Sequence, residues 1–138
     1  FRVWDSKTYD LLYTLTDHSR QIRCVDLVGN RAVSVCNENT CIIWDLDNGV
    51  AIKEVKDPQY SLYHSVKANK AFIAIIGRTF IRIVDWNGDK INEFDFGSNR
   101  RLSCVTFNIY SLVVGVLNVG SLTGELLIKQ FGSKYIEE

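Results

Sequence analysis

Three side chains have the types that a serine hydrolase uses. His18, Ser34 and Glu38 supply an imidazole, a hydroxyl and a carboxylate, the groups of a Ser–His–acid triad. The residues around Ser34 lack the Gly-x-Ser-x-Gly elbow that exposes a hydrolase nucleophile. A hydrolase is therefore kept only as an alternative, and we predict that the chain is not an enzyme.

Residues that ligate metals do not form a known motif. No C-x-x-C pair occurs, and the cysteines lie within apolar runs, so we expect buried free thiols, typical of a reducing compartment: Cys24, Cys36, Cys41 and Cys104. Asp47, Asn48 and Asp89 occupy predicted turns, but the calcium loop D-x-[DN]-x-[DN]-G is absent. Glycine-rich loops that cradle phosphate are also absent, so we predict no metal and no other cofactor.

The charge balance restricts the partners of the chain. Sixteen basic and sixteen acidic residues cancel, so no net field attracts nucleic acid or an anionic membrane. The longest apolar run, Ala71 to Ile76, is too short to cross a bilayer. We predict an intracellular protein, cytoplasmic or nuclear, that binds neither nucleic acid nor membranes.

Short β-rich runs separated by turns fill the chain. No sustained helical periodicity is present, and the single proline and nine glycines suit hairpins. Asn48-Gly49 is the strongest hairpin signal, because both residues tolerate positive φ. The sequence therefore predicts an all-β protein.

The predicted strands recur at a fixed interval. Trp4-Asp5, Trp44-Asp45 and Val84-Asp85 are spaced by 40 residues. This period divides the chain into a half repeat and three repeats: 1–16, 17–56, 57–96, and 97–138 with an insertion between its second and third strands. Aligned without a gap, the repeat 57–96 places Leu62 at the position of Ile22. In the last repeat, Ile128 is expected at the position that Trp44 holds in the repeat 17–56.

A period near 40 to 45 residues with a Trp-Asp ending resembles the WD-repeat family. The resemblance implies a partial WD-repeat β-propeller of about three and a half four-stranded antiparallel blades. It also implies that His18, Ser34, Glu38 and Trp44 form a hydrogen-bonded chain that fixes one blade, although the family usually has Asp at the Glu38 position. The implied function is a scaffold for protein–protein interaction.

Arginines gather in the loops that the resemblance places on one face. Arg20, Arg78, Arg100 and Arg101 would make a cationic patch able to hold a carboxylate or phosphate, unless they are simply solvated. Two further loop residues, Tyr60 and Asn99, would add aromatic and polar contacts. We therefore predict protein or peptide partners, including anionic ones.

A closer resemblance concerns the stretch from Ile22 to Ser34, whose "IRC…GN…VS" pattern is similar to blades of F-box WD-repeat proteins. This resemblance implies an alternative function, the substrate-recognition propeller of a ubiquitin ligase that reads acidic or phosphorylated peptides. No F-box segment is present in these residues to support it.

The first residues, Phe1 to Asp5, already lie inside a repeat. We therefore expect the chain to be a piece of a longer protein, with the missing blades among its partners. Uncovered blade faces would be an aggregation liability.

Overall fold

The computed structural model describes residues 1–56, 63–97, 100–107, 111–118 and 123–130, with side chains described for 1–56, 63–97 and 101–102. These residues form antiparallel sheets of two to four strands, which confirms the all-β prediction. The half sheet contains β1 (Arg2–Trp4) and β2 (Leu11–Thr14); the first sheet contains β3 (Ile22–Val28), β4 (Arg31–Cys36), β5 (Thr40–Asp45) and β6 (Val50–Lys56). The second sheet contains β7 (Tyr63–Ala68), β8 (Ile73–Gly77), β9 (Phe80–Val84) and β10 (Lys90–Asp95); the third contains β11 (Arg100–Phe107), β12 (Ser111–Asn118) and β13 (Thr123–Gln130).

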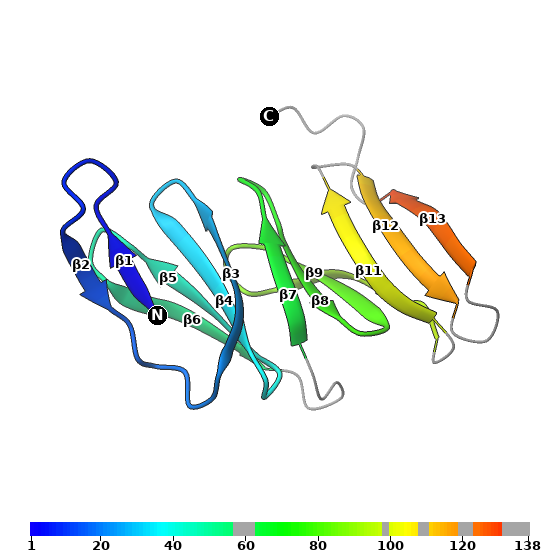
Figure 1. Cartoon of the computed structure of the whole chain (residues 1–138), viewed down its shortest axis with the longest axis horizontal. Helices are drawn as coiled ribbons and strands as arrows, with labels where there is room; N and C mark the ends of the chain where they lie inside the picture. Colours follow the sequence, from blue (N-terminus) through cyan, green and yellow to red (C-terminus); the bar gives the residue numbers. More distant parts are fainter. Residues whose placement is uncertain (57–62, 98–99, 108–110, 119–122, 131–138) are drawn as a thin grey trace.

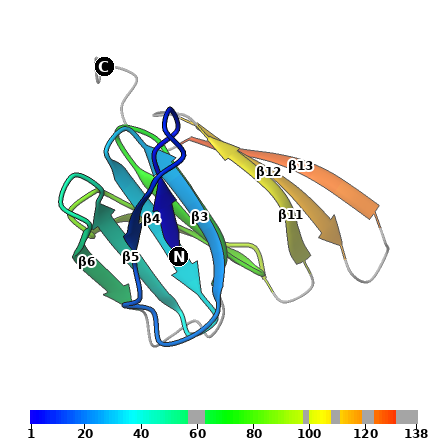
Figure 2. The same cartoon turned by 60° about the vertical axis from the view of Figure 1, so that its left-hand side comes forward.

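Each sheet pairs its strands in sequence order, and the sheets then follow one another along the long axis of the molecule (Figure 1). Figure 1 also shows the half sheet at one end of this row, and in Figure 2 it lies in front of the first sheet. In the described part of the chain, no helix has the length and apolar character needed to cross a membrane.

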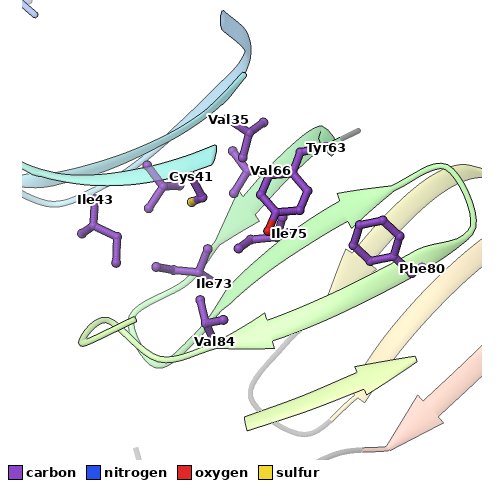
Figure 3. Packing of buried hydrophobic residues seen from close by; sticks show 10 residues of the cluster. Val35, Cys41, Ile43, Tyr63, Val66, Ile73, Ile75, Phe80 and Val84 are labelled. Carbon is purple, nitrogen blue, oxygen red and sulfur yellow. The ribbon is translucent and has the colours of Figure 1, made fainter. Parts of the chain in front are cut away.

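The core consists of the layers between neighbouring sheets. Alternation along a strand sends successive side chains to opposite faces, so β4 contributes Val33 to the layer against the second sheet and Ala32 to the layer against the half sheet. Figure 3 shows the larger layer, where Val35 and Ile43 of the first sheet face Ile73 and other residues of the second. Double-sided burial explains why several strands are apolar on both faces.

A repeated β-bulge fixes the true register of the repeats. The pairing of the inner strand with the next strand slips just after Ile22 in β3, Tyr63 in β7 and Leu102 in β11. Ile22 therefore corresponds to Tyr63, so the predicted match with Leu62 is wrong by one residue. The β8–β9 turn has one residue fewer than the β4–β5 turn, which restores the 40-residue spacing at the third strand.

Third strands show the same register in three sheets. Pairing with the following strand slips just before Trp4, Trp44 and Val84, which therefore occupy equivalent positions. Counted from the bulges after Leu102 and Ile22, Val113 corresponds to Val33. Val113 pairs with Ile128, and Val33 pairs with Ile43. Ile128 therefore corresponds to Ile43. The predicted match of Ile128 with Trp44 is thus wrong by one residue.

Candidate functional site

A hydrogen-bonded chain joins three of the four residues singled out in the first repeat. Ser34, on β4, is fully buried, and its Oγ accepts a hydrogen bond of 2.8 Å from the indole Nε1–H of Trp44 on β5. His18 Nε2 lies 2.5 Å from the same oxygen. The Trp44 ring also packs edge-on against Phe1 of the neighbouring half sheet. This chain therefore links the loop before β3 to the two central strands.

Glu38 does not belong to this chain, contrary to the expectation from the family resemblance. It lies in the exposed β4–β5 turn, where Oε1 pairs with Nε of Arg20 at 2.5 Å and Oε2 accepts from Ser19 at 3.4 Å. The second ring nitrogen of His18, Nδ1, is buried and has no hydrogen-bond partner among the described residues. The three groups of a Ser–His–acid triad are thus not aligned, because the acid is held by a guanidinium.

The environment of His18 favours its neutral form. Burial lowers the pKa of the imidazole from its ordinary value of 6.5. A protonated ring would carry a second N–H at the buried, unpartnered Nδ1, which is an unfavourable place for a donor. The neutral ring is therefore the form compatible with the Ser34 contact.

The second sheet has apolar residues at the equivalent positions. Counted from the bulge, Ser34 corresponds to Ile75 rather than to Ala74, and Trp44 corresponds to Val84. Ile75 and Val84 are fully buried against the first sheet. The layer between the first and second sheets thus replaces the polar chain with packing, although the buried hydroxyl of Tyr63 has no hydrogen-bond partner there within the described part of the chain.

The predicted arginines have different environments. The side chains of Arg20, Arg78 and Arg101 are all exposed, and that of Arg20 forms an ion pair with Glu38. The carbonyl of Arg78 accepts a 3.0 Å hydrogen bond from the backbone N–H of Leu102, so the turn before β9 and the start of β11 lie side by side. Arg78 and Arg101 are therefore brought into one neighbourhood.

The other predicted contact residues lie outside what the structure describes. Tyr60 and Asn99 are not among the described residues, and the Arg100 side chain is not described although its backbone begins β11. Their contribution to the loop surface stays a prediction.

The aspartates at the ends of the third strands have a role that was not predicted from the sequence. Asp5, Asp45 and Asp85 each accept backbone N–H bonds in the following turn, at 2.7 to 2.9 Å. The N–H groups of Thr8 and Lys7 lower the pKa of Asp5, and the Asn48 side chain is the main cause of the lowered pKa of Asp45. Their 40-residue spacing was the available signal.

A contact between Arg31 and Trp86 was also missed. The guanidinium carbon lies 5.8 Å from the centre of the indole ring, within the range of a cation–π interaction. Trp86 also donates its indole N–H to the carbonyl of Asn69 at 2.9 Å. The contact joins the first residue of β4 to the turn after β9, which no local sequence pattern indicates.

Groups that ligate metals stay apart in the described part of the chain, where no cluster of three or more histidine, cysteine or acidic side chains occurs. Cys36 and Cys41 are buried free thiols and Cys24 is partly buried, while the Cys104 side chain is not described. Burial raises the pKa of the Cys41 thiol to about 12.

No protein-family model and no curated protein matches the chain. Among solved structures, the chain is similar to the computationally designed Ika8 protein, with a TM-score of 0.73 and 18% identity over 94% of this chain and 42% of that chain. It is also similar to the computationally designed Ika4 protein, with a TM-score of 0.66 and 18% identity over 83% of this chain and 74% of that one. The chain thus spans less than half the length of Ika8, and the likeness concerns the fold alone.

Changing Ser34 to alanine is expected to lower the free energy of unfolding by about 1 to 3 kcal/mol, because buried partners lose their acceptor. Urea titration of the single variants and of a double variant with Trp44→Phe measures the effect. In the Trp44→Phe background the indole N–H is already gone, so Ser34→Ala should cost less there. Equal costs in both backgrounds would show that the Trp44 hydrogen bond contributes nothing.

Proposed function

We propose that the chain is part of a WD-repeat β-propeller and serves as a scaffold for protein–protein interaction. The observation that supports this proposal is the repeated register: the bulges at Ile22, Tyr63 and Leu102, and the equivalence of Trp4, Trp44 and Val84. A row of sheets built from one repeating unit presents its loops along two edges, a surface suited to recognition.

In this proposal the chain binds its partners without catalysis, in an intracellular compartment. Ser34, the one candidate nucleophile, is fully buried and engaged by Trp44 and His18. A nucleophile must meet its substrate, and this hydroxyl does not reach the surface.

The partner surface that we propose is the loop edge that carries Arg78 and Arg101, and the proposed ligand is an acidic peptide. Two exposed guanidinium groups in one neighbourhood suit bidentate recognition of carboxylate or phosphate. Arg20 would contribute only if the ligand displaced Glu38, which already occupies its Nε–H. Glu38 therefore acts in this proposal as an internal competitor that restricts the patch to strongly anionic ligands.

The test is binding to an immobilised library of acidic peptides, each present in phosphorylated and unphosphorylated form. Changing both Arg78 and Arg101 to Glu should weaken binding by at least about tenfold, since each lost hydrogen bond between charged groups costs about 1.5 to 3 kcal/mol. Added salt should also weaken binding by the unchanged chain, because the surface charges are screened.

The matched control is Lys7→Glu with Lys70→Glu, which makes the same change in charge in exposed turns elsewhere, after β1 and after β7. If both double variants lose binding equally, net charge rather than the arginine edge accounts for the effect. Binding that ignores both salt and the arginine changes would contradict the proposal.

A second candidate is the substrate receptor of a ubiquitin ligase, which the closeness of Arg78 and Arg101 favours, because a phosphate can accept from two guanidinium groups. The same library separates the two candidates. A receptor of phosphorylated substrates should prefer the phosphorylated member of each pair, whereas a general scaffold should bind both members to a similar extent.

A further inference from the structure

We propose that Arg23 and His64, the extra residues of two β-bulges, form a second subsite for an acidic group, carboxylate or phosphate, beside the loop edge that carries Arg78 and Arg101. The inference rests on the proposed function and makes it more specific. The ligand is an acidic peptide with two acidic groups, of which the loop edge binds one and the bulges bind the other.

Both residues lie outside the regular pairing of their sheets. The pairing of β3 with β4 passes over Arg23, and the pairing of β7 with β8 passes over His64. A bulge of this kind redirects a side chain out of the alternation of the strand. Both side chains are exposed, whereas the residues on either side of each are buried or half-buried. The bulges therefore present a guanidinium and an imidazole, both hydrogen-bond donors, at the surface.

The two bulges lie beside each other on neighbouring sheets, since β3 and β7 are adjacent in the row (Figure 1). Cys24 Sγ lies 3.6 Å from the carbonyl oxygen of Val66. Two residues further along both strands, the N–H of Ala68 donates a 2.7 Å hydrogen bond to Asp26 Oδ2. Both contacts join residues that are 42 positions apart, so the strands run in the same direction. At this offset Arg23 lies at the level of the β7 bulge.

The β7 bulge also lies next to the loop edge. Tyr63, the residue before His64, pairs with Gly77, the residue before Arg78. The backbone carbonyl of Arg78 in turn accepts a hydrogen bond from the start of β11. Three neighbouring sheets thus contribute donor groups to one region, with Arg23 at one end of it and the loop edge at the other.

Two carboxylates that could neutralise these donors are already occupied. Both oxygens of Asp26 accept from backbone N–H groups, and Glu38 pairs with Arg20. Within the described part of the chain, Arg23 and His64 take part in no ion pair. An acidic ligand therefore meets no internal carboxylate that competes for them, unlike at Arg20.

The test uses fluorescent peptides of glycine and serine that carry one pair of adjacent glutamates or two such pairs, and a matching set with phosphoserine in place of glutamate. Spacers of about two, four and six residues between the pairs cover roughly 7 to 20 Å in an extended chain. With the best spacer, the two-pair peptide should bind at least about fivefold more tightly than the one-pair peptide, because its second pair binds intramolecularly. The set with the larger gain identifies the acidic group.

The combined changes Arg23→Gln and His64→Gln should reduce this gain to less than about twofold and leave the affinity for the one-pair peptide within about twofold of its original value. The matched control is Lys67→Gln with Lys70→Gln, which removes two exposed cations near the other end of β7 and should keep the gain. Fluorescence anisotropy measures each affinity.

A gain that persists after the changes at Arg23 and His64, or that is absent from the unchanged chain at every spacer, would overturn the second subsite. The proposed function would survive either result, provided that Arg78→Gln with Arg101→Gln still weakens binding of the one-pair peptide. If these two arginine changes leave that binding unaltered, the proposed function itself fails, and the second subsite fails with it.

Discussion

Changing Trp44 to alanine is expected to lower the free energy of unfolding by about 3 to 5 kcal/mol, the range for removing a large buried aromatic side chain. The indole is 1% exposed, packs edge-on against Phe1 of the half sheet and donates its N–H to Ser34. Alanine would leave a cavity between the half sheet and the first sheet and would remove one partner of Ser34. Urea titration followed by circular dichroism measures the loss.

The chain contains its own control for this substitution. Trp4 occupies the equivalent place on β1 but is 54% exposed. Trp4→Ala removes the same side chain from the same position of the repeat, and we expect a loss of about 1 kcal/mol or less, because little packing disappears. If the two variants lose the same free energy of unfolding, burial of Trp44 against the half sheet does not account for its contribution to stability.

The period of 40 residues predicted the third strands of the half, first and second sheets, because an aspartate directly after Trp4, Trp44 or Val84 marks each of them, whereas it missed the register of β13 by one residue. Asp5 and Asp45 each bind the backbone of the following turn, so the residue type is tied to a local structure that a sequence can display. The inner strands carry no such mark. Their register depends on one more residue between Trp44 and Tyr63 than between Trp4 and Ile22, and on a β8–β9 turn shortened by one residue; these two changes offset each other within the repeat.

The candidate site shows the same division between local and distant causes. Ser34 and Trp44 lie diagonally across one hairpin, since Trp44 pairs with Ala32 two residues before Ser34, so their contact follows from the repeat. Two residues near Glu38 in the sequence could bind its carboxylate, His18 and Arg20, and the sequence does not show which of them does so. The exposed turn lets the carboxylate meet the flexible guanidinium, while the imidazole is drawn inward toward Ser34.

Removing the carboxylate of Glu93 is expected to be as costly as removing Trp44, at about 3 to 5 kcal/mol, because it removes two charge-assisted hydrogen bonds from a buried guanidinium. Glu93 Oε1 binds Nη2 and Nε of Arg82 at 2.8 and 3.1 Å, and the Arg82 side chain is only 8% exposed. Strand alternation places Arg82 on the face of β9 that also carries Phe80 and Val84, toward the first sheet. The free energy of unfolding of Glu93→Ala, from urea titration, measures the effect.

Glu54→Ala is the matched control, because Glu54 holds the equivalent place on β6, opposite Ile42 as Glu93 lies opposite Arg82. Its carboxylate pairs with Lys56 at the surface, where both side chains are more than half exposed, so a loss of about 1 kcal/mol or less is expected.

The repeat also indicates how the Glu93→Ala loss can be reversed. Arg82 corresponds to Ile42, which is 2% exposed in an apolar layer of the first sheet. Adding Arg82→Ile to Glu93→Ala removes the buried charge and restores the residue type that the first sheet uses, so most of the lost stability should return. If the double variant is no more stable than Glu93→Ala, the cost lies in the lost packing of Glu93 and not in the buried charge of Arg82.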